Sequence, residues 1–159
     1  MESGLPRAAL VTGGSRGIGA AIAIGLAHAG HSVAVNYVRD RDAATEVVAA
    51  IEELGGRAVA VQGDVGQRAE AEHVVDEAAA RLGPVTCLVN NAGIHRGAPV
   101  VKLAPEAWDE SISVNLSGAF YVTRQCLFSM YEARWGRIIF IGSAASRVPF
   151  PGDAAYAAT

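Results

Sequence analysis

Residues 8–19 read Ala8-Ala9-Leu10-Val11-Thr12-Gly13-Gly14-Ser15-Arg16-Gly17-Ile18-Gly19. The pattern predicts a short apolar strand, a glycine turn and the first turn of a helix. The three glycines at 13, 17 and 19 have no Cβ, so the backbone can turn sharply and approach a ligand. The N–H groups at the start of the helix would then face an anion such as a pyrophosphate. A plain strand-to-helix turn is the alternative, but three glycines are costly for that purpose alone.

Further strands and helices alternate along the chain. We expect strands at 32–37, 57–61, 86–90 and 137–141, helices at 42–54, 67–82 and about 106–133, and a loop at 91–104. This alternation predicts an α/β fold, a doubly wound parallel sheet of the Rossmann type with helices on both faces. The apolar run at 86–90 indicates a strand buried on both faces. In such sheets, ligands bind at the carboxyl ends of the strands.

Apolar spacing predicts which helical residues face the core. Ile18, Ile22 and Leu26 recur every four residues and should share one buried face of the first helix, which Gly30 closes. The helix at 42–54 is expected to turn four residues inward, namely Val47, Val48, Ile51 and Leu54.

Composition sets bounds on function. The chain has 159 residues, 51% of them hydrophobic and 18% charged, with a net charge of −3. This suits one domain and gives no basic field for nucleic acid or an anionic membrane. Four scattered histidines and the distant Cys87 and Cys126 predict no metal site and no disulfide. Met1 to Gly4 begin no signal peptide, and no apolar run reaches 18 residues, so we expect a cytoplasmic protein without a membrane partner.

The end of the second strand bears on cofactor choice. NAD-preferring sites usually place Asp or Glu there for the ribose 2′-hydroxyl. Here the strand ends in Asn36-Tyr37, with Arg39 just beyond and Arg16 in the glycine loop. Two guanidinium groups would suit a 2′-phosphate, which favours NADP(H). The alternative for Arg39 is a solvated surface charge.

The spacing T-G-x-x-x-G-x-G resembles the nucleotide loop of the short-chain dehydrogenase/reductase family, and Asn90-Asn91-Ala92-Gly93 resembles its N-N-A-G motif. The resemblance implies that Asp64 accepts a hydrogen bond from the adenine amino group, although a turn residue is the alternative. The residues expected to contact the cofactor are Gly13, Ser15, Arg16, Gly17, Ile18, Gly19, Asn36, Arg39, Asp64, Val65, Asn91, Ala92 and Gly93.

Three polar residues resemble the family's catalytic set. Ser143 follows the fifth strand, Tyr156 comes 13 residues later, and Asn115 lies within the long helical stretch. A ketone that accepts hydride develops negative charge on its oxygen and needs a proton and a second hydrogen bond. The resemblance assigns the proton to Tyr156, the second bond to Ser143 and a water in the proton path to Asn115. A buried, satisfied amide is the alternative for Asn115.

The sequence departs from the family after Tyr156. The family places a lysine four residues later, and the sequence ends at Thr159. We therefore expect residues 1–159 to be a single NAD(P)-binding Rossmann domain, incomplete at its C-terminus. Without the lysine, we expect this chain to be inactive by itself.

Arg134-Trp135-Gly136-Arg137, with the two loops, resembles bacterial 3-oxoacyl-[acyl-carrier-protein] reductases. This resemblance implies reduction of a 3-oxoacyl thioester and a contact of Arg134 with acyl-carrier protein. The stretch 106–133 carries a wide apolar face that could be core only, but it also resembles the family's helix that pairs with its copy, which implies a homo-oligomer, usually a tetramer. A solvated arginine is the alternative for Arg134. Two other readings remain: a dehydrogenase of the same family that acts on a sugar, steroid or polyketide, and a nucleotide-binding module without chemistry.

Overall fold

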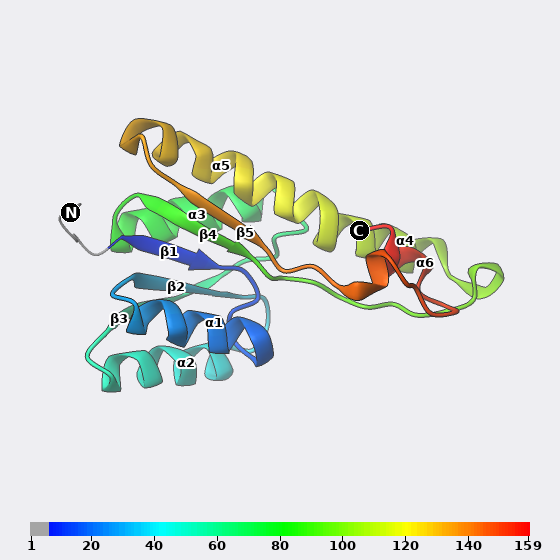
Figure 1. Ribbon diagram of the computed structural model, residues 1–159, viewed down its shortest axis with the longest axis horizontal. Helices are drawn as coiled ribbons and strands as arrows, with labels where there is room; N and C mark the ends of the chain where they lie inside the picture. The colour runs from blue at the N-terminus through cyan, green and yellow to red at the C-terminus, as the bar shows by residue number, and fades with distance from the viewer. Residues whose placement is uncertain (1–6) are drawn as a thin grey trace.

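The computed structural model describes residues 7–159, so the expectation for Met1 to Gly4 lies outside the described residues. Its five strands form one parallel sheet in the order β3-β2-β1-β4-β5 (Figure 1), which confirms the predicted fold class. The strands are β1 Ala8–Val11, β2 Ser32–Tyr37, β3 Arg57–Gln62, β4 Val85–Asn90 and β5 Arg137–Phe140. The helices are α1 Gly17–His28, α2 Arg41–Glu53, α3 Arg68–Leu82, α4 Pro105–Ser111, α5 Gly118–Ala133 and α6 Ala154–Ala157, with shorter turns η1 Val100–Lys102, η2 Ile112–Ser117 and η3 Ala144–Ser146.

Helices cover both faces of the sheet. Successive strand residues point to opposite faces, so Leu10 packs with α3 and α5 while Val11 packs with α1 and α2. Every residue of β1, β2 and β4 is buried, as the apolar run in β4 predicted. The core therefore has two layers, one on each side of the central strands.

β5 lies at one edge of the sheet and is mostly exposed. Ile139 and Phe140 are 44% and 61% exposed. The strand ends one residue earlier than predicted, although the Ile141 N–H still donates to the Asn90 carbonyl at 2.9 Å.

Two predicted core positions are wrong. Ile18 is 63% exposed because the first turn of α1 stands at the cleft described below, and Gly19 and Ala23 are the buried residues of that helix. Leu54 is 55% exposed because α2 ends at Glu53 and Leu54 is already its C-cap. Spacing alone placed both residues on inward faces, and each lies at the end of its helix.

The helical stretch expected at 106–133 consists of three segments. α4 passes into a π-helical turn, η2, and then into α5. Val122, Cys126 and Met130 face the core, whereas Phe120 and Phe128 are 61% and 58% exposed. The wide apolar face of the sequence is thus part core and part surface. α4 and α6 project beyond the carboxyl ends of the strands (Figure 1).

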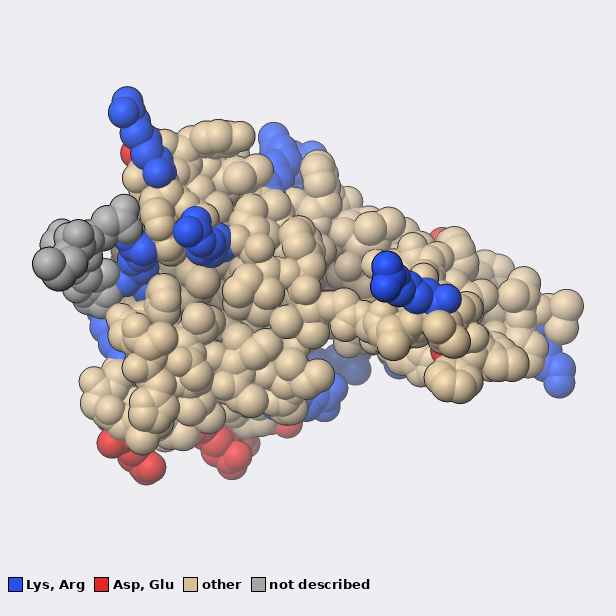
Figure 2. All heavy atoms as spheres, in the orientation of Figure 1, with Lys and Arg blue, Asp and Glu red and all other residues tan. Residues whose placement is uncertain are grey.

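The cysteines are buried, free thiols. Burial raises the pKa of Cys126 to about 12 and also raises the pKa of Cys87, so both stay uncharged at neutral pH. Within residues 7–159, no group of three or more His, Cys, Asp or Glu side chains could hold a metal ion. None of the helices in that range has the length and apolar character needed to cross a membrane. On the face shown in Figure 2, the Lys and Arg side chains stand apart and form no continuous basic surface.

Candidate active site

The glycine loop connects β1 to α1 at the carboxyl edge of the sheet. Gly13 and Gly17 have φ values of 60° and 54°, which residues other than glycine rarely adopt. A Cβ on Gly19 would collide with the Gly13 carbonyl oxygen and lie 2.6 Å from the Asn91 amide nitrogen. The loop therefore needs glycine at position 19 because two backbone segments and a side chain meet there.

Thr12 joins the ends of β1 and β4. Its hydroxyl accepts hydrogen bonds from the N–H groups of Asn91 and Ala92, both at 3.0 Å. The Asn91 amide donates in return to the carbonyls of Thr12 at 2.9 Å and Gly13 at 3.1 Å. Thr12 is thus a site residue that the sequence prediction missed, and its place at the head of the T-G-x-x-x-G-x-G pattern was the available signal.

A cleft of about 590 Å³ opens over these strand ends. All of the predicted cofactor residues except Gly17 and Asn36 line it. The sequence prediction missed other lining residues, which are Tyr37, Val38, Asp40, Ile94, Arg96, Glu110 and Val114. Most predicted cofactor residues are therefore brought together at one hollow.

Asn36 faces the interior instead of the cleft. It is 1% exposed, its Oδ1 accepts from the Gly13 N–H at 3.1 Å, and its amide donates to the carbonyls of Val61 at 3.4 Å and Gly63 at 3.0 Å. The side chain thus fixes the glycine loop to the ends of β2 and β3. This corrects the expectation of a direct cofactor contact from the Asn36 side chain.

Charged side chains line the mouth of the cleft. Arg16 and Arg39 line the cleft and are exposed. Arg96 and Glu110 form a two-point ion pair at 2.8 and 3.0 Å. The hydrogen bond from Arg96 lowers the pKa of Glu110, and the positive charges of Arg96 and Arg39 act in the same direction.

Asp64 lies at the wall of the cleft and also makes a turn. Its Oδ1 accepts from the Gly66 N–H at 2.9 Å, and its own N–H donates to the Glu70 carboxylate at 2.7 Å. The two interpretations of Asp64, as a turn residue and as a contact for the cofactor, are therefore compatible.

Asn115 lies in the π-helical turn, a feature that often marks functional sites. Its Oδ1 accepts from the Ile94 N–H at 2.8 Å, and its Nδ2 donates to the Ile94 carbonyl at 2.9 Å and to the Thr159 hydroxyl at 3.1 Å. The amide is satisfied and holds the loop after β4 against the last residues of the chain.

Ser143 and Tyr156 lie on neighbouring elements. Ser143 precedes η3 and is exposed, with its Oγ accepting from the Ala145 N–H at 3.2 Å. Tyr156 is half-buried on α6, which packs against η3 and α4. Neither side chain lines the 590 Å³ cleft, but Ile94 belongs to its wall and bonds Asn115. Asn115 thus contacts the lining of the cleft, Tyr156 packs on His95, the residue after Ile94, and Ser143 precedes the turn that packs against α6.

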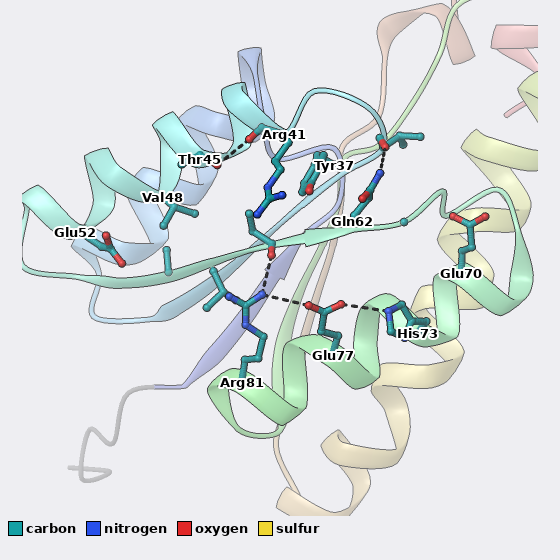
Figure 3. A pocket seen from close by; sticks show the side chains of 15 residues that line it. Tyr37, Arg41, Thr45, Val48, Glu52, Gln62, Glu70, His73, Glu77 and Arg81 are labelled. Carbon is teal, nitrogen blue, oxygen red and sulfur yellow. Dashed lines mark hydrogen bonds and ion pairs between the residues drawn. The ribbon is translucent and has the colours of Figure 1, made fainter.

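A larger hollow of about 750 Å³ lies over β3 between α2 and α3 (Figure 3), and none of the predicted catalytic residues lines it. Arg81 donates to the Ala60 carbonyl at 2.9 Å and pairs with Glu77 at 3.2 Å, and Glu77 also contacts His73 at 3.2 Å. These side chains pair with one another and with the strand edge. This hollow is therefore separate from the predicted catalytic residues.

Comparison with known proteins gives consistent results. The family profile described as short chain dehydrogenase matches residues 7–159. The 3-oxoacyl-[acyl-carrier-protein] reductase FabG of Staphylococcus epidermidis is 39% identical over 153 residues, which are 96% of this chain and 63% of that protein. This chain thus spans less than two thirds of that relative's length.

Two solved structures have the same arrangement. One is a short chain dehydrogenase from Burkholderia cenocepacia in complex with NADP, with 41% identity and a TM-score of 0.87 over 96% of this chain and 62% of that one. The other is a blue fluorescent protein from a metagenomic library in complex with NADPH, with 37% identity and a TM-score of 0.87 over the same shares of the two chains.

Proposed function

This chain belongs to the short-chain dehydrogenase family, and from that premise we propose that it binds NADP(H) and supplies the proton donor of a reductase that converts a ketone to a secondary alcohol. The observation that carries the proposal is the cradle formed by Gly13, Gly19 and Asn91 at the carboxyl ends of β1 and β4. Because the two glycines have no side chains, the N–H groups at the start of α1 are open to a phosphate.

The cleft residues fit the cofactor. A side chain at Gly19 would fill the space in which the loop backbone closes, so the glycine is required there. The N-terminus of α1 would hold the pyrophosphate, Asp64 and Val65 the adenine, and the small Ala92 and Gly93 the ribose side. Arg16 and Arg39 would hold the 2′-phosphate, since guanidinium pairs well with phosphate oxygens. The NADP and NADPH complexes of the two similar structures support this choice.

The cofactor supplies hydride to the carbonyl carbon when it is bound. Tyr156 donates the proton that the developing alkoxide needs, and Ser143 donates a hydrogen bond to the same oxygen. Asn115 would order the loop after β4 through its two hydrogen bonds with Ile94, a residue that lines the cofactor cleft.

The substrate that we propose is a 3-oxoacyl thioester carried on acyl-carrier protein. The name of the Staphylococcus relative supports this class. Arg134 is exposed at the end of α5 in a left-handed conformation and would contact the acidic carrier protein. Arg137 has a different environment, because its guanidinium lies 5.2 Å from the Trp135 ring.

We also propose that the complete protein is a homo-oligomer. Leu116, Phe120, Phe128 and Tyr131 are 50–76% exposed along η2 and α5. An apolar face of this kind on a helix is typical of a contact between copies of a chain.

The test of the reaction uses the purified complete protein, because we expect residues 1–159 to be inactive by themselves, together with NADPH and an acetoacetyl thioester. Tyr156→Phe should lower kcat by about 100-fold or more, because a general acid contributes at least that factor, and should leave NADPH binding unchanged. Tyr131→Phe is the matched control, since it keeps the aromatic ring of the proposed contact face and Tyr131 does not line the cleft, and it should keep its activity. Unchanged turnover in Tyr156→Phe would remove this residue from the reaction.

Cofactor choice is tested separately. Arg16→Ala should raise the Kd for NADPH about tenfold, the equivalent of one lost charged contact, while the Kd for NADH should change little. Arg68→Ala, which removes an exposed arginine of α3, serves as the control. Equal losses for NADPH and NADH would contradict the 2′-phosphate contact. NADPH binding without any ketone reduction would instead support the alternative of a nucleotide-binding module.

A further inference from the structure

Three contacts fasten the segment that carries Tyr156 to the rest of the molecule. The Ala98 N–H donates to the Gly152 carbonyl at 3.0 Å, the His95 Nε2 lies 2.8 Å from the Asp153 Oδ1, and the Asn115 amide donates to the Thr159 hydroxyl at 3.1 Å. They stand on both sides of Tyr156 in the sequence. The short helix α6 therefore takes its position from the loop after β4 and from η2.

The contact between His95 and Asp153 has a defined chemistry. A carboxylate only accepts hydrogen bonds, so the Nε2 of His95 carries the proton and donates it. The second carboxylate oxygen of Asp153 accepts from the Phe150 N–H at 3.0 Å. The hydrogen bond from His95, followed by that from Phe150, lowers the pKa of Asp153. Asp153 thus stays ionised and holds the imidazole in one orientation.

The imidazole of His95 also contacts the proposed acid. Its ring centroid lies 5.1 Å from that of Tyr156, and the two planes are 81° apart, which is an edge-to-face arrangement. His95 therefore bonds Asp153 at the start of α6 and packs on Tyr156 one turn later. These two contacts restrict both the helix and the phenol ring.

We propose that His95 and Asp153 form a positioning pair that sets the orientation of the Tyr156 phenol toward the carbonyl of the substrate. The proposal rests on the proposed function, in which Tyr156 is the acid. Neither residue belongs to the motifs that resemble the family, and they are 58 positions apart in the sequence. The pair acts on the transition state, since a misplaced acid slows proton transfer without weakening the binding of either reactant.

The kinetic test uses the complete protein and compares three changes at two histidines. His95→Phe keeps an aromatic ring beside Tyr156 but removes the hydrogen bond, and it should lower kcat about tenfold with KM for the ketone and Kd for NADPH nearly unchanged. His95→Gln, whose amide can donate to Asp153, should recover most of that loss. His73→Phe makes the same replacement on the outer surface of α3, where His73 contacts Glu77, and should have no effect.

The outcomes separate positioning from mere support of the loop. A kcat of His95→Phe equal to that of His73→Phe would overturn the proposal. So would a rise in the Kd of NADPH as large as the fall in kcat, because it would mean that the loop after β4 has come apart. Asp153→Ala should lower kcat by a similar factor, and combining it with His95→Phe should add little, as expected for two partners of one contact.

A spectroscopic measurement tests the pair without turnover. The protein is labelled at tyrosine Cζ, and the Tyr156 signal is identified by its loss in Tyr156→Phe. Asp153→Ala removes the partner of His95 without changing the ring beside Tyr156, and it should shift or broaden this signal, whereas His73→Phe should not. An unchanged Tyr156 signal in Asp153→Ala would overturn the pair even if the protein reduced no ketone, an outcome that would separately contradict the proposed function.

Discussion

The part of the chain from β1 to β4, with α5 packed on it, and the remainder of residues 91–159 are held together differently. In the first, β1, β2 and β4 are buried at every residue, and apolar side chains fill both faces of the sheet. In the second, β5 and η3 are largely exposed, and the proposed catalytic residues are placed by polar contacts such as Asn115 to Ile94 and His95 to Asp153. Burial therefore builds the first part, and hydrogen bonds on exposed elements orient the proposed catalytic residues of the second.

This difference separates stability from activity. Segments with few buried apolar contacts open at lower free-energy cost than the core does. We therefore expect changes in the first part to act mainly on unfolding. Changes in the second part should act mainly on turnover. Three measurements test this division, beginning with the largest expected effect.

The first compares one aliphatic residue from each part. Leu88 in β4 is fully buried, so Leu88→Ala should lower the free energy of unfolding by about 2–5 kcal/mol through lost burial and a residual cavity. Ile139 in β5 is 44% exposed, so Ile139→Ala should cost less than about 1 kcal/mol. Urea unfolding measures both. Equal losses would mean that β5 is as much a part of the core as β4.

The second compares two glycines of α1. Gly19→Ala places a methyl group against the Gly13 carbonyl and the Asn91 amide. This overpacking should lower the free energy of unfolding by about 1–3 kcal/mol and raise the Kd for NADPH about tenfold. Gly25→Ala adds a Cβ that meets no described atom within 4 Å, and it should stabilise the helix by about 0.5–1 kcal/mol. Thermal unfolding and NADPH titration measure the two effects. Tight NADPH binding by Gly19→Ala would contradict the cradle.

The third and smallest effect is a pH dependence in the second part. The pKa of Glu110 is lowered by Arg96, so the ion pair contributes stability above the ordinary carboxyl range and loses it as the pH falls through the lowered value. The difference in unfolding free energy between the unchanged protein and Glu110→Gln should therefore be small at neutral pH and vanish in acid. Glu46, exposed on α2 and in no ion pair among residues 7–159, gives the control Glu46→Gln. An increase in this free-energy difference at acid pH would contradict the predicted direction of the pH dependence.

Local patterns predicted the sheet and most of the cleft. The apolar run in β4 and the glycine that closes the first helix are recognised from neighbouring residues, and Gly30 does take a positive φ value. Because the carboxyl ends of parallel strands meet at one edge, residues as distant as Gly13 and Asn91 could be assigned to one site.

Contacts between distant side chains could not be predicted in this way. The inward turn of the Asn36 amide, the pair Arg96–Glu110 and the pair His95–Asp153 depend on how loops lie on the fold. No spacing marks them in the sequence. Periodicity has a different limitation, which Ile18 illustrates. It predicts which face of a helix is apolar, but not whether another element covers that face at the start of the helix.

Arg81 makes the two edge strands of the sheet, β3 and β5, differ. On the outer side of β3, its guanidinium takes the Ala60 carbonyl, and its own carbonyl accepts from Arg57, so an arriving strand would have to displace charged groups already in use. β5 presents Ile139 and Phe140 with no such guard among the described residues. An added strand would therefore pair more readily with β5 than with β3.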